Sequence, residues 1–241
     1  MCAPALHAVD QYLYGIITHR REKNDGGEDL LSVLIASGMD DALIRDQLLT
    51  MFIAGHDTST ALLAWTLYLL GKHPNVMARV RDEIDAHLKG EAPTIENTAR
   101  LRYLQCVIDE TLRLYPPIHL GTRRILNNLQ FQGYDLPEGK RANYSIYLTH
   151  RNPNHWPDPG VFNPDRFLHE NERSRQPYTY LPFGGGPRNC IGAAFAQVEA
   201  KIVIACLIQT FDFTLDPAKV RVYMGATPEP RPGVMMTVKR R

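Results

Sequence analysis

The sequence predicts a mainly α-helical fold with small β-sheets, and three observations support this prediction. Residues 41–72 form one long apolar segment, and residues 193–209 form a second helix-like run directly after a glycine-rich loop. Prolines and glycines divide the region between them into short strand-like stretches. At 241 residues and 44% hydrophobic composition, the chain can bury one sizeable core, or one core with a small satellite. We therefore expect a single domain over residues 1–241.

Charge and cysteine content exclude several classes of protein. The chain has 27 basic and 26 acidic residues, so nothing directs it to nucleic acid or to an anionic membrane. Its four cysteines, Cys2, Cys106, Cys190 and Cys206, show no CxxC spacing, which argues against a disulfide framework or a zinc ribbon. Residues 1–10 lack the basic flank and apolar run of a secretory signal. We expect a reducing, cytoplasmic location.

Three helices are expected in the first third of the chain. Residues 6–23 carry apolar residues on one face, and residues 29–37 form a short helix that ends at Gly38. The third helix, residues 41–72, would be roughly 48 Å long. Its part from residue 48 to residue 70 has the length of a membrane span, but Asp57 lies near the middle, where a bilayer imposes a cost of roughly 2.5–3.5 kcal/mol. We therefore expect a buried helix of a soluble protein.

Two amphipathic helices follow, and then a region of strands and turns. Pro74 and Gly90 bound the first helix, and the second runs over residues 99–115 and stops before two prolines. Short strands are predicted at residues 120–126, 129–134 and 140–145, with a tight turn at 137–139, then a proline-rich loop at 150–159. Closing strands are expected after the last helix, at residues 211–215, 220–223 and 235–238.

The glycine-rich loop, residues 183–192, reads FGGGPRNCIG. Its three successive glycines allow the backbone to approach something flat and bulky. Cys190 comes just before a helix, whose free N–H groups and positive dipole end stabilise a thiolate. A lone thiolate suits a metal that already has other ligands, such as haem iron. The plain alternative is a surface turn with a buried free cysteine; a phosphate-binding loop is excluded because no Lys-Ser or Lys-Thr follows the glycines.

This loop resembles the haem-binding loop of the cytochrome P450 family, whose pattern is Phe-x-x-Gly-x-Arg-x-Cys-x-Gly. All five specified positions match, as Phe183, Gly186, Arg188, Cys190 and Gly192. The resemblance implies that Cys190 is the axial thiolate of haem b and that Phe183 shields its sulfur. It also implies that Arg188 pairs with a haem propionate and that the glycines allow close approach to the ring.

Residues 54–58, Ala-Gly-His-Asp-Thr, resemble the oxygen-binding stretch of the same family, Ala/Gly-Gly-x-Asp/Glu-Thr. The resemblance implies that Asp57 and Thr58 carry protons to dioxygen at the haem and that Ala54 leaves room for it. The alternative is a kinked core helix, because Gly55 weakens a helix and the Thr58 hydroxyl can bond to a backbone carbonyl. A metal phosphohydrolase signature is weaker, since no further His or Asp cluster supports it.

Two further segments resemble the family. Glu110 and Arg113 lie on one helix face, where the ordinary interpretation is an exposed pair worth a few tenths of a kcal/mol. They also resemble the family's Glu-x-x-Arg pair, and residues 162–167 match the segment whose arginine, here Arg166, joins that pair. The resemblance implies a buried clamp that holds the cysteine loop. Arg123 stands where the family often supplies a second propionate partner, with Arg124 as the alternative.

The resemblance implies a P450-like fold that lacks its N-terminal portion, since the chain has about half the usual family length. The missing part would include the roof of the substrate pocket and any membrane anchor. A fragment, a truncated gene product and one half of a two-chain assembly all fit. The implied activity is that of a haem-thiolate monooxygenase, which inserts one oxygen atom of O2 into an apolar small molecule and takes electrons from a reductase or a ferredoxin-type donor. The alternative is a non-catalytic remnant that binds haem weakly or not at all, and the intact loop and the Asp57-Thr58 pair favour the enzyme.

Overall fold

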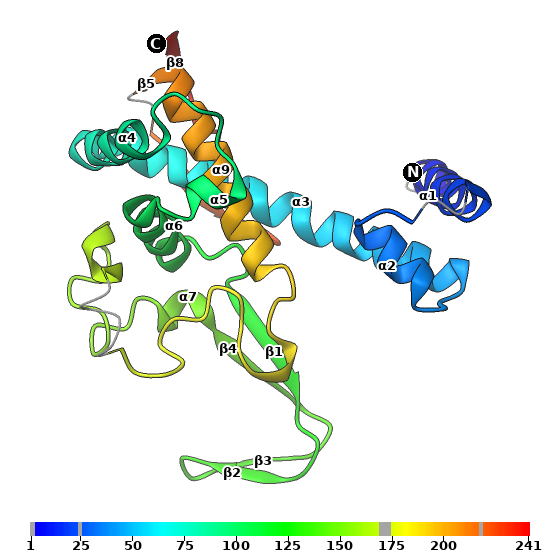
Figure 1. Ribbon diagram of the computed structural model, residues 1–241. Helices are drawn as coiled ribbons and strands as arrows, with labels where there is room; N and C mark the ends of the chain where they lie inside the picture. Colours follow the sequence, from blue (N-terminus) through cyan, green and yellow to red (C-terminus); the bar gives the residue numbers. More distant parts are fainter. Residues whose placement is uncertain (1–2, 24–25, 169–174, 217–218) are drawn as a thin grey trace. The chain divides into compact units, whose positions relative to one another are not determined.

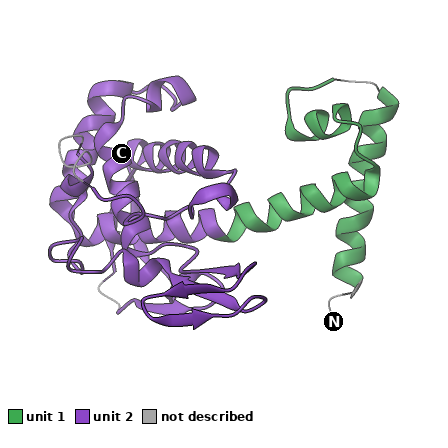
Figure 2. Ribbon diagram, turned by 90° about the horizontal axis from the view of Figure 1, so that it is seen from below, with its two compact units in different colours: residues 1–57 green, residues 58–241 purple. Residues whose placement is uncertain are grey.

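The computed structural model describes residues 3–23, 26–168, 175–216 and 219–241, which fall into two compact units. Unit 1 is residues 1–57 and unit 2 is residues 58–241 (Figure 2). Helix α3 (Asp41–Lys72) is unbroken, and its first part belongs to unit 1 and its remainder to unit 2. The elements are labelled along the chain in Figure 1.

Unit 1 consists of α1 (Ala3–Lys23), α2 (Leu30–Ala36) and the first part of α3. Asp29 caps α2, because its carboxylate accepts a hydrogen bond from the Ser32 backbone N–H at 2.9 Å. The three helices bury a small apolar cluster made of Ile17, Leu31, Leu34 and Ile44. The helices predicted from the sequence in this region are confirmed.

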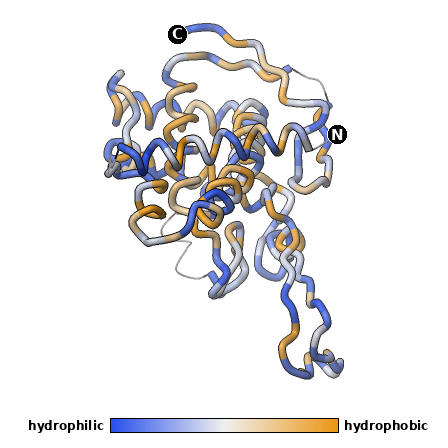
Figure 3. The backbone as a smooth tube through the Cα atoms, turned by 90° about the vertical axis from the view of Figure 1, so that its right-hand side faces the viewer, coloured by the Kyte–Doolittle hydropathy of each residue, from blue (hydrophilic) through white to orange (hydrophobic). Residues whose placement is uncertain are grey.

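The helices of unit 2 pack the second part of α3 with α4 (Pro74–Leu88), α5 (Ile95–Thr98), α6 (Arg102–Leu114) and α9 (Ala193–Thr210). Hydrophobic and hydrophilic stretches are interspersed along the backbone (Figure 3), and helices α4 and α6 are amphipathic, with one apolar face buried. The main core draws on each of the longer ones, with Leu69, Ile84, Ile108 and Ile204 among its fully or almost fully buried members.

Helix α6 is fixed at its start by a side chain from α4. Its own N-cap residue, Leu101, makes no side-chain cap. Instead the Glu83 carboxylate accepts hydrogen bonds from the backbone N–H groups of Tyr103 at 2.7 Å and Leu104 at 2.9 Å. A carboxylate at this position satisfies two free helix donors and interacts favourably with the helix dipole. This contact positions the helix that carries Glu110 and Arg113.

The strands form four separate two-stranded antiparallel sheets. They are β1 (Leu120–Arg124) with β4 (Arg141–Ser145), β2 (Leu129–Phe131) with β3 (Tyr134–Leu136), β5 (Phe211–Leu215) with β8 (Met236–Arg240), and β6 (Arg221–Met224) with β7 (Pro228–Arg231). The predicted class, mainly α with small β-sheets, is confirmed.

One strand prediction was wrong, and several short elements were missed. Residues 129–134 form a hairpin rather than one strand, because Gln132 and Gly133 have φ of 48° and 82° and make a two-residue turn between β2 and β3. The missed elements are α5, α7 (Ile146–Thr149), the 3-10 helices η1 (Pro164–Phe167) and η2 (Gly186–Arg188), and β7. Prolines begin η1 and occupy two of the four positions of β7, which hid both from a propensity argument.

Helix α9 is the one helix in the described ranges with the length and apolar composition of a membrane span. Its residues Ala200, Ile204, Ala205 and Ile208 are buried in the core of unit 2. The stretch from residue 48 to residue 70 in α3 does not meet the same test. The expectation of a buried helix is wrong for residues 51–57, which are exposed. It holds beyond residue 60, where the buried residues are Ala61, Leu62, Trp65, Leu69 and Leu70.

Candidate functional site

The cysteine loop is a tight structure held by its own backbone. Gly184 and Gly186 have φ of 79° and 72°, values that favour glycine over residues with a side chain. The Cys190 N–H donates to the Phe183 carbonyl at 2.9 Å, so the two ends of the loop meet. The Phe183 ring packs against the main core, and Gly192 is the N-cap residue of α9. The sequence prediction of a glycine loop followed by a helix is confirmed.

Cys190 lies exposed on this loop, three residues before α9. Two apolar residues close to it in the sequence are also exposed, Ile191 at 91% and Phe195 at 73%. Cys106 is buried and Cys206 is exposed on α9, whereas Cys2 lies outside the described residues. The alternative of a buried free cysteine at position 190 is therefore wrong.

The donor set at the loop fits a metal that brings its other ligands with it. In the part of the chain that the structure describes, no three His, Cys, Asp or Glu side chains come together to hold a metal ion. Cys190 therefore offers one soft sulfur ligand from a backbone with two glycines that leave space above it. Exposed apolar side chains beside an exposed thiol suit the face of a flat, apolar macrocycle, so the residues present fit haem.

The two arginines proposed for the propionates lie on different elements of unit 2. Arg188 ends η2 within the loop and is exposed. Arg123 is exposed on β1, where its guanidinium lies 5.5 Å from the centre of the Tyr144 ring and donates to the Thr122 carbonyl. Arg124, the alternative, is the next residue of the strand and so points to the opposite face.

The predicted oxygen-binding residues lie on consecutive turns of α3. Ala54 and Asp57 are exposed, and the Asp57 carboxylate is 2.9 Å from Nδ1 of His56. Thr58 is half-buried. The helix is continuous through the motif, and the predicted kink stays a prediction.

Within unit 2, the part of α3 that begins at Thr58 is joined to the helix that follows the cysteine. The Ser59 hydroxyl donates to the Glu199 carboxylate of α9 at 2.7 Å. Glu199 lies about 9 Å along the axis from the start of α9, given a rise of about 1.5 Å per residue. The residue after Thr58 and the helix after Cys190 are therefore in direct contact.

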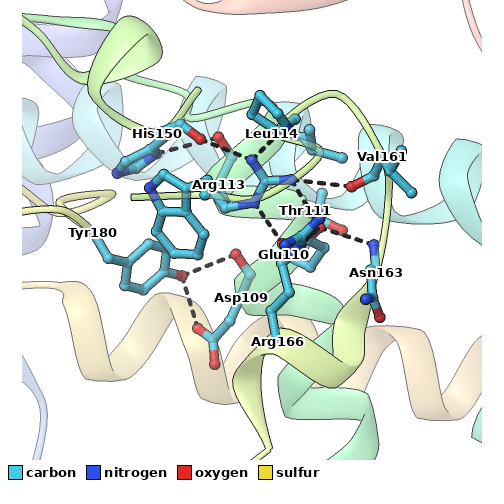
Figure 4. A network of polar contacts seen from close by, with 12 residues as sticks. Asp109, Glu110, Thr111, Arg113, Leu114, His150, Val161, Asn163, Arg166 and Tyr180 are labelled. Atoms are coloured by element: carbon cyan, nitrogen blue, oxygen red, sulfur yellow. Dashed lines mark hydrogen bonds and ion pairs between the residues drawn. The ribbon is translucent and has the colours of Figure 1, made fainter. Parts of the chain in front are cut away.

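The predicted burial and pairing of Glu110, Arg113 and Arg166 are confirmed, and the role of this clamp in holding the cysteine loop stays a prediction. Glu110 and Arg113 are both fully buried and form a two-pronged ion pair, with distances of 2.7 and 2.8 Å (Figure 4). Arg166 is 13% exposed, and its Nε lies 3.5 Å from the same carboxylate. The Asn163 N–H also donates to Glu110, at 2.9 Å. The interpretation as an exposed ion pair is wrong.

Arg113 uses all of its donors in this cluster. Beyond the two bonds to Glu110, its Nη1 and Nη2 atoms donate to the carbonyls of His150, Pro159 and Val161 at 2.8, 2.8 and 3.2 Å. A guanidinium has five N–H donors, so this buried cation is fully satisfied. The clamp therefore ties α6 to the proline-rich loop of residues 150–159.

Sequence reasoning missed two residues that connect this clamp to the cysteine loop. The Tyr180 hydroxyl donates to the carbonyl and the carboxylate of Asp109, both at 3.0 Å (Figure 4). Burial raises the pKa of Tyr180 well above its ordinary value. His150 contacts both Arg113 and Leu181. Neither residue belongs to a recognisable motif, and a histidine at the start of a proline-rich loop carries no signal of burial.

Comparison with known proteins gives one consistent result. The family model described as Cytochrome P450 matches residues 2–239. The chain is 39% identical over 230 residues to Protein LUTEIN DEFICIENT 5, chloroplastic, of Arabidopsis thaliana, covering 92% of this chain and 39% of that protein. It is 37% identical over 231 residues to Putative cytochrome P450 120 of Synechocystis, covering 93% and 52%.

A solved structure also matches this chain over nearly its whole length. The crystal structure of the cytochrome P450DA heme domain superposes with a TM-score of 0.91 at 34% identity, covering 96% of this chain and 53% of that one. The chain thus spans about two fifths to one half of the length of these proteins.

Proposed function

The chain belongs to the cytochrome P450 family, and from that premise we propose that it is the haem-bearing part of a haem-thiolate monooxygenase. The proposed reaction inserts one oxygen atom of O2 into an apolar organic substrate and uses electrons from a reductase or a ferredoxin-type donor. The observation that carries the proposal is the exposed Cys190 on a glycine loop at the start of α9, in a chain that the family model matches almost throughout.

The residues of the loop would bind and orient the cofactor. Cys190 would supply its sulfur as the axial ligand, and the positions of Gly184 and Gly186 would let the backbone lie close to the ring. Gly192 would serve the same purpose at the helix start, where a Cβ would lie 3.9 Å from the Cys190 sulfur. The Phe183 ring would cover the sulfur from the core side. When bound, haem supplies the activation of dioxygen and the oxidation of a C–H bond.

Two exposed guanidinium groups would hold the propionates. Arg188 and Arg123 offer planar, permanently charged donors, which suit carboxylates. Arg188 already lies on the loop that carries the cysteine. We assign Arg123 rather than Arg124, because neighbouring residues of a strand point to opposite faces and Arg123 lies on the same face as Gly121. The absence of a side chain at Gly121 makes room for the Tyr144 ring on that face.

Proton delivery is assigned to the middle of α3. The Asp57 carboxylate would accept and release a proton near the solvent, and the Thr58 hydroxyl would hold a proton towards the site of oxygen reduction. Ala54, with only a methyl group, would leave space beside them. The contact between Ser59 and Glu199 supports the proposal, since it joins this part of α3 to the helix that follows Cys190.

Two further parts of the proposal concern the substrate and the location of the protein. Ile118 and Leu120 are both about half exposed, and they would offer an apolar surface to the substrate. A cytoplasmic location stays a prediction, because one of the similar proteins is named as chloroplastic.

A spectrum of the haem-loaded chain tests the proposed function. We expect the purified chain to bind one equivalent of haem and, once reduced and exposed to carbon monoxide, to give the absorption band typical of a thiolate ligand. The second candidate is a remnant without activity that binds haem weakly or not at all. A chain that binds haem weakly or without the thiolate band would support the remnant and overturn the enzyme.

A further inference from the structure

His150 contacts the buried clamp on one side and, on the other, the segment that leads into the cysteine loop. Its side chain is fully buried. Nδ1 of the ring is 3.2 Å from the Arg113 carbonyl oxygen, and Nε2 is 2.7 Å from the backbone nitrogen of Leu181. Leu181 comes two residues before Phe183, the first residue of the loop. No motif in the sequence assigns this histidine a role.

The two partners fix the protonation state of the ring. A carbonyl oxygen can only accept a hydrogen bond, so Nδ1 must carry the proton. A backbone N–H can only donate, so Nε2 must be bare. The bridge therefore requires a neutral imidazole with its proton on Nδ1.

The surroundings of the ring keep it neutral. The pKa of His150 is lowered to about 3, chiefly by burial and also by the positive charges of Arg113 and Arg151, while the hydrogen bond to the Arg113 backbone partly opposes this shift. On its other side the ring stacks against Tyr180, with 5.3 Å between the ring centres. These groups oppose protonation throughout the physiological range.

A series of backbone hydrogen bonds continues from this bridge to the cysteine. The Leu181 carbonyl accepts from the Gly184 N–H at 3.0 Å, and the Phe183 carbonyl accepts from the Cys190 N–H at 2.9 Å. At the opposite end, the His150 carbonyl accepts from the Arg113 guanidinium at 2.8 Å. The bridge thus joins Arg113, whose five donors are all used, to the segment that leads into the cysteine loop.

We propose that His150 is a positioning residue for Cys190. Its neutral imidazole bonds the clamp to the segment that leads into the cysteine loop, and so fixes where the loop lies. The inference rests on the proposed function, because the purpose of fixing Cys190 is to hold its sulfur as a ligand. It goes beyond that function by assigning a role outside the loop and outside the clamp.

Three variants test the proposal. His150→Leu removes both hydrogen bonds and keeps an apolar side chain in the core. His150→Gln offers a donor and an acceptor on one planar amide and cannot be protonated, so it should restore the bridge. His155→Leu is the control, because His155 is exposed in the same loop.

The first measurement is amide hydrogen exchange over residues 181–190 of the purified full chain. In His150→Leu we expect exchange at Leu181 to be about tenfold faster than in the wild type, the factor that corresponds to the loss of a typical hydrogen bond. The Gln variant and the control should stay within about twofold of the wild type. If His150→Leu fails to fold, the Gln variant decides. The wild type should lose protection at Leu181 as the pH falls below about 6.5, the ordinary pKa of a histidine, and His150→Gln should not.

The second measurement is the thiolate band of the haem-loaded, reduced, carbon monoxide-bound chain. In His150→Leu, part of the band should shift to that of a protonated or displaced thiol, and in His150→Gln it should be retained. A full thiolate band or unchanged exchange in His150→Leu overturns the inference, as does equal loss of protection in acid for His150→Gln. A wild-type chain without the band instead overturns the proposed function, and the inference with it.

Discussion

Replacing Glu110 by alanine should lower the free energy of unfolding of unit 2 by several kcal/mol. Glu110 is fully buried and accepts hydrogen bonds from Arg113 and from the Asn163 backbone, and it also faces Arg166. In the variant, Arg113 would keep only its three carbonyl partners and would be left buried with no counter-charge. Arg166 would lose the same partner.

The magnitude follows from the burial of the pair. Breaking a buried ion pair by removing one partner costs roughly 3–5 kcal/mol, and leaving the Asn163 N–H without an acceptor costs a further 1–3 kcal/mol or so if it stays buried. These contributions share one site and do not add fully, so we expect a loss of about 4 kcal/mol or more. A typical domain has about 5–15 kcal/mol of stability in total.

Urea unfolding followed by tryptophan fluorescence is the appropriate assay. The two tryptophans, Trp65 and Trp156, are both buried in unit 2 and report its unfolding. The control is Glu229→Ala, which breaks a 2.8 Å pair with Arg231 whose side chains are 41% and 59% exposed. It should change the free energy of unfolding by less than about 1 kcal/mol. A loss below about 1 kcal/mol in Glu110→Ala would refute the view that the clamp is a buried structural centre.

Three further predictions concern acid, the start of α6 and proton delivery. The pKa of His150 is lowered from 6.5 to about 3, so the unfolded chain binds more protons than the folded chain between these pH values. The wild type should therefore lose about 2 kcal/mol of unfolding free energy between pH 7 and pH 5, and His150→Gln should not. Parallel pH curves for the two proteins would contradict this. Glu83→Ala leaves two N–H groups of α6 without their acceptor and should cost about 1–2 kcal/mol in urea unfolding, whereas an unchanged midpoint would show that water replaces the cap. In the haem-loaded chain supplied with electrons, Thr58→Ala should keep haem binding but divert electrons into hydrogen peroxide, and an unchanged ratio of product to electrons consumed would leave the motif without a role in proton delivery.

The longer helices were predictable from the sequence because each is marked at its ends or by its length. Pro74 begins α4, prolines follow α6, and the apolar run of residues 41–72 matches α3 residue for residue. The hairpin of β2 and β3 was not predictable in the same way. Its turn uses Gln132 at a positive φ, where glutamine is uncommon, and only the following Gly133 marks the turn.

The clamp shows that the family resemblance predicted a buried ion pair where the spacing of residues along a helix could not. From spacing alone, Glu110 and Arg113 are an ordinary pair on a helix surface. Only the long-range partners distinguish the buried case, since the Val161 carbonyl and the Asn163 N–H lie about 50 residues further along the chain. The role of His150 could not be predicted from the sequence, because its ring bonds to two backbone groups and such groups are the same whatever the residue type.

The central claim is that Cys190 holds the haem through its sulfur atom. Cys190→Ser tests this claim because it replaces that sulfur by oxygen and leaves the rest of the side chain unchanged. The measurement is the carbon monoxide difference spectrum of the reduced, haem-loaded chain, recorded for Cys190→Ser and for Cys206→Ser, which alters the other exposed free cysteine of the described residues. We predict that Cys190→Ser loses the thiolate band completely and that Cys206→Ser keeps it at full intensity. A thiolate band that persists in Cys190→Ser would contradict the account.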